Sequence, residues 1–209
     1  MECAVSTKKN EVNGMKILVA VPTFENILPE TFRSIYKACH KYENADFEFV
    51  KGYDCARARN EIIKKALDGN YNYVLMVDSD IIIPETALDY LLENPVDICT
   101  GFFPRKNTNI KELELFKLGT KDYINRFMYD EIQSNERIEI KGCGFGCILI
   151  NVNVLKNLKY PWFKYVVYDS GAFLSEDLYF CTEARNAGYK IYADPRVRCG
   201  HSIRGFQYE

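Results

Sequence analysis

Short apolar runs alternate with helical segments over the first hundred residues, and this alternation constrains the fold more than any other feature. The apolar runs predict strands at Lys16–Val21, Phe47–Lys51, Tyr73–Val77 and Asp97–Thr100. The segments between them place apolar side chains on one helical face and predict helices at Leu28–Tyr42, Ala56–Leu67 and Glu85–Leu92. Because such alternation is typical of βαβ units, we expect an α/β fold with a mostly parallel, Rossmann-like sheet flanked by helices.

The second half of the chain does not continue this pattern. Residues 107–135 are polar and rich in Lys and Tyr, and we expect a variable excursion there that contains a short antiparallel ribbon. Glycines followed by an apolar strand mark residues 138–151. A helix is predicted at Ser175–Gly188, with strands at Lys190–Ala193 and Arg196–His201.

The domain organisation that we expect is simple. Residues 1–14 are polar and without pattern, which predicts a loose tail that lacks the apolar core of a secretory signal. No repeat and no Pro- or Gly-rich linker divides the rest of the chain. We therefore expect residues 15–209 to form a single domain.

Charge and cysteine content restrict the partners and the compartment. With 27 Lys and Arg against 29 Asp and Glu, the formal charge is −2, so the chain as a whole has no electrostatic reason to bind nucleic acid or an anionic membrane. Its apolar runs are much shorter than the roughly 20 residues of a membrane span. The 8 cysteines are scattered, and we expect reduced thiols in a cytoplasmic protein.

The string Asp78-Ser79-Asp80 carries the strongest chemical signal. It follows the continuous apolar run Tyr73–Val77, which has the composition of a central parallel strand. Ligands of such sheets collect at the carboxyl ends of strands, where two carboxylates are costly unless a cation lies between them. A hard divalent cation that bridges a diphosphate fits this place. The alternative is that either aspartate caps the next helix or turns the chain.

The start of the second predicted helix is also charged. Arg57, Arg59 and Asn60 could present guanidinium groups and backbone donors to an anion, or they could form a solvated helix face. Asp54 is placed either to cap this helix or to touch a base or a ribose.

Glycines and aromatics mark the second half. Gly142, Gly144 and Gly146 alternate before a predicted strand, which permits close approach of a ligand. The aromatic pair Trp162-Phe163 predicts either a platform on which a sugar ring stacks or a plug over the core.

In this order and spacing, these strings resemble GT-A glycosyltransferases of the family-2-like kind, of the small type found in bacteria and phages. The resemblance covers residues 16–203 and is carried by Pro22–Asn26, Arg57–Asn60, Asp78–Asp80, Gly142–Ile150, Ser175–Cys181, Gly188–Pro195 and His201. It implies transfer of a sugar from a nucleotide-diphosphate donor with Mn²⁺ or Mg²⁺ at the DxD motif. It also implies a nucleotide-binding half at 15–104 and an acceptor-side half at 105–209.

The resemblance assigns roles residue by residue. The nucleotide donor is expected on Pro22, Thr23, Phe24, Glu25, Asp54, Arg57, Arg59, Asn60, Asp78 and Ser79. The expected metal ligands are Asp78, Asp80 and His201, with core hydrogen bonding as the alternative for the histidine. The acceptor is expected on Gly144, Phe145, Trp162 and Glu176.

Glu176 and Asp177 head the last predicted helix, where the helix dipole favours negative charge. The resemblance makes Asp177 the general base of an inverting enzyme and places Glu176 beside it, on the acceptor; with retention of configuration the pair would only position substrate. Successive helical residues point roughly 100° apart, so the two carboxylates cannot both face one reacting atom.

The function that we expect is therefore metal-dependent glycosyl transfer, with a UDP-sugar as the donor. The acceptor stays open between a saccharide, a protein and a modified nucleobase in DNA. One rival function is a sugar-1-phosphate nucleotidyltransferase, which would need a Gly-rich basic loop where this chain has Pro22–Asn26. Another is a nucleotide-sugar or glycan-binding module without catalysis.

Overall fold

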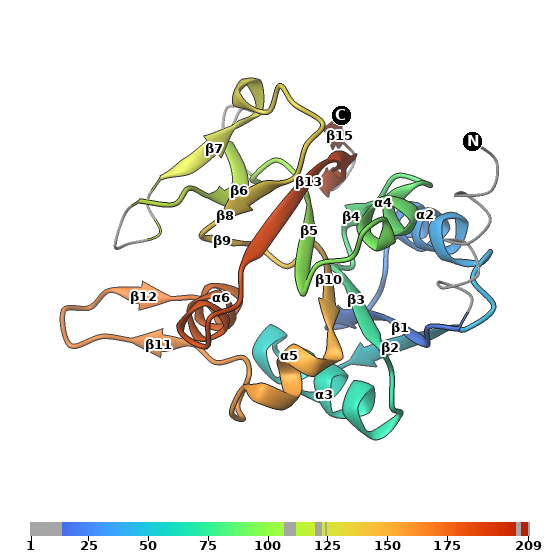
Figure 1. Cartoon of the computed structure of the whole chain (residues 1–209), viewed down its shortest axis with the longest axis horizontal. Coiled ribbons are helices and arrows are strands. Elements are labelled where there is room, and N and C mark those ends of the chain that lie inside the picture. Colours follow the sequence, from blue (N-terminus) through green and yellow to red (C-terminus); the bar gives the residue numbers. More distant parts are fainter. Residues whose placement is uncertain (1–13, 107–111, 120–122, 124, 204–205, 209) are drawn as a thin grey trace.

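A seven-stranded sheet forms the centre of the computed structural model, which describes residues 14–106, 112–119, 123, 125–203 and 206–208 (Figure 1). The strand order is β2 (Ala45–Lys51), β1 (Ile17–Thr23), β3 (Tyr73–Val77), β10 (Cys147–Asn151), β5 (Ile98–Phe102), β13 (Ile191–Arg198) and β8 (Ile138–Ile140). Strands β1, β2, β3, β5 and β13 run in one direction, and β10 and β8 run against them. The predicted α/β class with a mostly parallel sheet is confirmed.

The order of the strands differs from a simple continuation of the first half. Strand β5 does not lie beside β3, because β10 is inserted between them and pairs antiparallel with both. Four of the five residues of β10 are buried, so this apolar strand is stabilised by neighbours on both edges. Periodicity predicts a buried strand here, but it contains no information about the strand's neighbours or direction.

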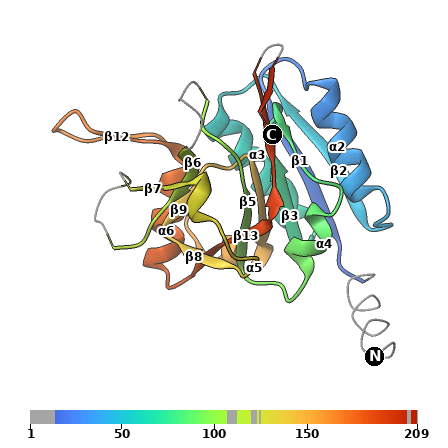
Figure 2. The same ribbon diagram turned by 90° about the horizontal axis from the view of Figure 1, so that it is seen from above.

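Helices cover both faces of the sheet (Figure 2). One face carries α3 (Cys55–Asp68), α5 (Val152–Asn157) and α6 (Glu176–Asn186), and the other carries α2 (Pro29–Cys39) and α4 (Ala87–Leu92). Alternate side chains of β3 enter the two cores: Met76 packs in the core under α3, and Leu75 packs in the core under α2. The sheet is therefore buried on both sides, as the apolar runs predict.

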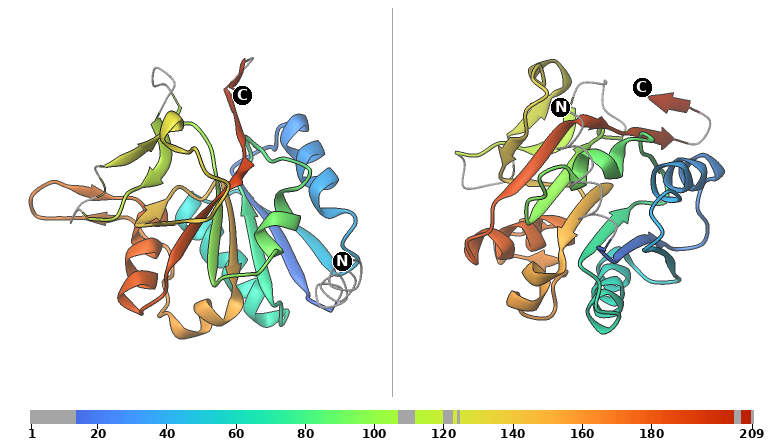
Figure 3. Two further views of the ribbon diagram at one scale, coloured as in Figure 1. Left: turned by 45° about the horizontal axis from the view of Figure 1, so that its top comes forward. Right: turned by 45° about the vertical axis from the view of Figure 1, so that its right-hand side comes forward.

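The second half of the chain adds a small sheet and a projecting hairpin. Strands β6 (Glu112–Phe116), β7 (Arg126–Met128) and β9 (Gly142–Cys143) pair antiparallel, and a 3₁₀ turn at Tyr129–Glu131 follows β7. The predicted ribbon is confirmed, and the glycine segment joins it through β9. Strands β11 (Val166–Val167) and β12 (Phe173–Leu174) form a hairpin that extends away from the body (Figures 1 and 3).

The observed strands near the end of the chain differ from the two strands predicted at 190–193 and 196–201. The first continues as β13 to Arg198, with a shift of register between Ala193 and Arg198. The chain then enters β14 (Gly200–Ile203), which leaves the central sheet and pairs with β4 (Ile81–Ile82) and β15 (Phe206–Tyr208). This pairing places His201 opposite Ile81, directly after the DxD string.

Two further predictions concern residues that the structure describes only in part. The predicted tail at 1–14 lies outside them except for Gly14. The cysteines that the structure describes are free thiols, and Cys3 lies outside the described residues. Within the described part of the chain, no helix combines the length and the apolar character needed to cross a bilayer.

A buried ion cluster around Asp194 connects α4 to β13. The Asp194 carboxylate accepts from Arg137 Nε at 3.1 Å and from Arg196 Nη2 at 2.8 Å. Arg137 also donates to the backbone carbonyls of Tyr90 and Glu93, each at 2.7 Å, at the end of α4. Burial opposes the ionised form of Asp194, but these hydrogen bonds outweigh it and lower its pKa.

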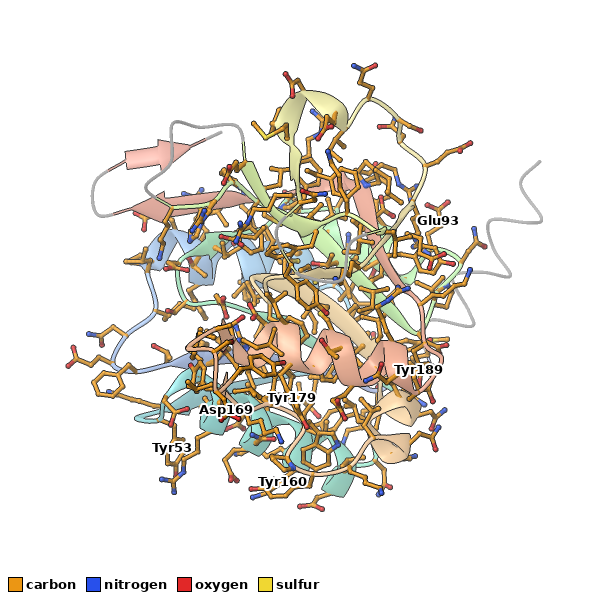
Figure 4. The ribbon with its side chains drawn as sticks, turned by 90° about the vertical axis from the view of Figure 1, so that its left-hand side faces the viewer. Tyr53, Glu93, Tyr160, Asp169, Tyr179 and Tyr189 are labelled. Carbon is orange, nitrogen blue, oxygen red and sulfur yellow. The ribbon has the colours of Figure 1, made fainter. Side chains whose placement is uncertain are left out.

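We predict that Asp194→Asn lowers the free energy of unfolding at pH 7 by about 3 kcal/mol, because two arginines lose their buried anionic partner. A carboxyl with a lowered folded-state pKa stabilises the fold above its unfolded pKa, near 3.9, and this contribution is lost as the pH falls through the folded-state pKa. Urea denaturation over a series of pH values should therefore show a large difference between wild type and variant at pH 7, which shrinks as the pH falls below about 3.9. Asp169→Asn, at the exposed tip of the hairpin, is the control (Figure 4); equal stability of the two variants at pH 7 would contradict the prediction.

Candidate active site

A cavity of about 650 Å³ opens where β1 and β3 end. Many of the residues expected at the site line it, from six separate segments of the chain. These are Pro22, Thr23, Phe24, Asp54, Asp78, Ser79, Asp80, Gly144, Phe145, Asp177 and His201. The structure thus brings together the end of β1, the start of α3, the DxD string, the glycine segment, the last helix and the terminal strand.

One wall of the cavity is formed by the loop after β1 and by the start of α3. The hydroxyl of Thr23 donates to the Asn26 carbonyl at 2.6 Å and closes the loop. Gly52, with a φ of +85°, turns the chain from β2 towards α3 and donates its N–H to the Thr23 carbonyl at 3.1 Å. The carboxylate of Asp54 accepts from the Arg57 N–H at 3.0 Å, so Asp54 caps α3 and also lines the cavity.

Arg59 lies behind the cavity rather than in it. It is 2% exposed and donates from Nη2 to Asp78 Oδ1 at 2.9 Å and from Nη1 to Glu176 Oε1. A buried guanidinium needs anionic partners, and this one joins α3 to the end of β3 and to the start of α6. Burial raises the pKa of Asp78 and of Glu176, and the charge of Arg59 acts in the opposite direction on both.

Asp80 lies between a lysine and a histidine. Its Oδ2 pairs with Lys106 Nζ, and its Oδ1 is 3.7 Å from His201 Nε2. His201 Nδ1 is 2.8 Å from the Pro104 carbonyl oxygen, which can only accept a hydrogen bond. Nδ1 therefore carries a hydrogen, and in the neutral imidazole Nε2 presents a lone pair to Asp80. A positive group between these two acceptors would stabilise the arrangement.

Only part of the expected metal site comes together. Two ligands that bind one Mg²⁺ at about 2.1 Å lie roughly 3 to 4 Å apart, so Asp80 and His201 fit a shared ion. The hydrogen bond from His201 Nδ1 to a carbonyl is also the support that metal-binding histidines use. However, no group of three or more His, Cys, Asp and Glu side chains among the described residues could hold a metal ion. The expected trio is not assembled among these residues, and Asp78 Oδ1 pairs with the buried Arg59.

Asp177 lies on the cavity wall, and Glu176 lies behind it. Asp177 Oδ1 accepts from the Ser175 hydroxyl and from the Leu178 N–H, the latter at 2.7 Å. Its Oδ2 lies 3.7 Å from the point that a Cβ on Gly144 would occupy, so the missing side chain at Gly144 leaves room beside this oxygen. Glu176 is 6% exposed and directed to Arg59. The two carboxylates point in different directions, as the turn of the helix predicts.

The remaining expected residues have other surroundings. Asn60 is buried and holds the aromatic segment against α3: its Nδ2 donates to the Phe163 carbonyl at 2.7 Å and its Oδ1 accepts from the Trp162 N–H at 3.0 Å. Trp162 packs into the core and donates from its indole to the Leu155 carbonyl. Of the two predicted roles, it therefore has that of a plug over the core and not that of a sugar platform. The guanidinium of Arg57 lies 4.2 Å from the ring centre of Tyr53. Glu25 is exposed, and neither it nor Arg57 is among the described residues that line the cavity.

Several cavity residues carry no sequence signal that identifies them. They are Tyr53, Cys55, Ala58, Phe103, Lys106, Glu114 and Tyr165. Glu114 comes from β6, where its Oε1 is 3.6 Å from Arg105 Nε and its Oε2 is 3.7 Å from Arg126 Nε. Burial raises the pKa of Glu114. The alternation of charged and apolar residues in β6 predicts an outward face, but only the fold directs that face into the cavity.

Comparison with known proteins supports the fold. No family model matches the chain, and a search of curated proteins finds no match. Among solved structures, A197 from STIV matches with a TM-score of 0.64 at 18% identity, over 90% of this chain and 86% of that chain. UDP-glucose pyrophosphorylase matches with TM-scores of 0.44 (apo) and 0.42 (complexed with UDP-glucose), both at 8% identity. These matches cover 92% and 90% of this chain and 77% and 76% of those chains. The likeness to A197 agrees with the α/β class described above.

We predict that Glu176→Gln lowers the free energy of unfolding by about 2 kcal/mol, because Arg59 loses one of its two buried charged partners. Glu183→Gln, on the more exposed part of the same helix, is the matched control and should change stability by less than roughly 0.5 kcal/mol. Urea denaturation measures both. A side chain that served only to bind acceptor would leave stability unchanged, so equal values for the two variants would show that the Arg59–Glu176 pair has no structural importance.

Proposed function

We propose that the protein is a metal-dependent glycosyltransferase that moves a sugar from a nucleotide-diphosphate donor, a UDP-sugar, to an acceptor hydroxyl. One observation supports this most: Asp78, Asp80, Asp177 and His201, which lie far apart in the sequence, surround one cavity at the carboxyl end of the sheet. Open α/β sheets bind their ligands at this position. A glycan, a protein and a modified nucleobase remain the candidate acceptors.

The donor lies along the wall that β1 and α3 form. Pro22, Thr23, Phe24 and Asp54 line this wall, together with Tyr53. Phe24 is 69% exposed, so its ring offers an open face to a base. The nucleoside is placed here, and its diphosphate points towards Asp78 and Asp80.

Asp80 and His201 hold the divalent cation, Mn²⁺ or Mg²⁺. The cation, when bound, offsets the negative charge that develops on the departing diphosphate. Asp78 lies two positions before Asp80 and is oriented by Arg59, so it faces the same region without being a required ligand.

Asp177 is the general base. Its Oδ1 is held by Ser175 and by the backbone of Leu178, which fixes the direction of the carboxylate. Its Oδ2 faces the space beside Gly144 and takes the proton from the acceptor hydroxyl as that oxygen bonds to C1 of the sugar. Glu176 acts through Arg59 and positions Asp78 rather than touching the acceptor.

We predict that wild-type protein binds UDP in the presence of MnCl₂ and that Asp80→Asn abolishes this binding, because the ion loses its anionic ligand. Binding to the folded state raises the melting temperature, so a thermal-shift titration with UDP and MnCl₂ measures it. Asp169→Asn should respond like wild type. An Asp80→Asn protein with an unchanged UDP response would rule out a metal on Asp80, and a wild type without any response would refute the proposed function.

We predict that Asp177→Asn retains UDP binding but lowers sugar transfer by roughly 10²–10⁴-fold, the usual contribution of a general base. The asparagine keeps the shape of the side chain and removes its ability to accept a proton. The measurement is the transfer rate from a UDP-sugar, with UDP affinity determined on the same preparation. Normal turnover in this variant would exclude Asp177 as the base. Release of UMP instead of UDP would point to nucleotidyl transfer, and UDP binding without turnover to a binding module.

A further inference from the structure

The charge of the cavity presents a problem for a diphosphate. Its described lining includes the carboxylates of Asp54, Asp78, Asp80, Glu114 and Asp177. Lys106 is the single lysine or arginine among these described lining residues. A diphosphate that enters such a cavity meets like charge, and the interaction is unfavourable unless cations lie close to the phosphates. The position of Lys106 therefore decides how the donor can bind.

The backbone before Lys106 is held in place by hydrogen bonds, but the long lysine side chain can change its conformation. The backbone before it is fixed to β6, because the Arg105 N–H donates to the Glu112 carbonyl at 2.9 Å and Pro104 forms a β-bridge with Leu113. The side chain of Lys106 is 42% exposed and reaches Asp80 Oδ2. A lysine ammonium on its four-carbon stem is a point charge that can change partners without a change of backbone.

Three arginines near the cavity have other carboxylate partners: Arg59, Arg105 and Arg126, the last with Nε 3.7 Å from Glu114 Oε2. Arg59 is buried between Asp78 and Glu176. Arg105 lies on the β6 side, with Nη1 3.3 Å from Glu112 Oε2 and Nε 3.6 Å from Glu114 Oε1. Lys106 is thus the cation that the geometry leaves beside the expected phosphates, and its carboxylate partner, Asp80, is the residue that a metal ion would also use.

We propose that Lys106 is a diphosphate-binding residue that occupies Asp80 in the empty site and passes to the donor diphosphate when a divalent cation takes its place on that carboxylate. This inference rests on the proposed function. Lys106 and His201 approach different oxygens of Asp80, so His201 can remain in place during the exchange. An ion beside Lys106 repels the ammonium and favours its release towards the phosphates.

The exchange predicts that Lys106 weakens binding of the cation and strengthens binding of the nucleotide. In the empty site Lys106 competes with the cation for Asp80, so its removal should strengthen cation binding. In the loaded site Lys106 contacts phosphate, so its removal should weaken nucleotide binding. Simple damage to the site would weaken both, and this difference in sign separates the proposal from a purely structural role for Lys106.

The test uses Lys106→Gln in the full chain, with MnCl₂ and UDP as probes. Mn²⁺ binding without nucleotide, followed by electron paramagnetic resonance, should become several-fold tighter than in wild type. UDP binding at saturating Mn²⁺, followed by calorimetry, should weaken roughly 10- to 100-fold, as expected for the loss of a charge-assisted hydrogen bond. Lys106→Arg keeps the charge and should retain most of the UDP affinity.

Lys117→Gln is the matched control, because Lys117 pairs with Glu131 and is not among the described residues that line the cavity. It should leave both affinities unchanged. If wild type binds UDP with Mn²⁺ and Lys106→Gln behaves like Lys117→Gln, or binds Mn²⁺ more weakly than wild type, the role of Lys106 is wrong while the proposed function stands. If wild type binds no UDP, the proposed function fails, and this inference fails with it.

Discussion

The buried guanidinium of Arg59 is the interaction on which the site depends. It connects three elements, because it extends from α3 to Asp78 after β3 and to Glu176 at the start of α6. A charge buried in this way is stable only with its partners in place, so the three elements are held in one relative arrangement. Asp177 follows Glu176 on α6, and Asp80 follows Asp78. The positions of the candidate base and of the candidate cation ligand are therefore both tied to Arg59.

The second constraint is the path of the chain after the central sheet. Strand β13 runs beside β5, and its irregular register near Asp194 precedes the departure of β14 from the sheet. Because β14 pairs with β4, His201 reaches Asp80 although the two residues are more than a hundred positions apart. The small sheet of β6, β7 and β9 likewise brings residues that are distant in sequence to the cavity. It carries Glu114 into the cavity and anchors the backbone just before Lys106.

The local sequence pattern was sufficient to predict most helices and strands and part of the candidate site. Strand β3 has the predicted bounds, and the residues after it line the cavity together with Thr23 and Asp177. The prediction of direct contacts by Arg59 and Trp162 was less successful, because side-chain type does not reveal which side of an element faces solvent. Arg59 lies on the buried face of α3, and Trp162 packs into the core. The insertion of β10 between β3 and β5 was equally hidden, since strand pairing depends on contacts that are distant in sequence.

The sequence by itself determined the α/β class, the buried strands and the carboxylates that end them, because hydrophobic periodicity and the composition of strand ends are local properties. It also determined that Glu176 and Asp177 would point in different directions, since the turn of a helix separates neighbouring side chains. Only the tertiary structure decided that Glu176 would face Arg59, that Asp80 would lie between Lys106 and His201, and that Glu114 would enter the cavity. Those contacts join segments that no local pattern relates, and they form only where the packing of the sheet and its helices brings the segments together.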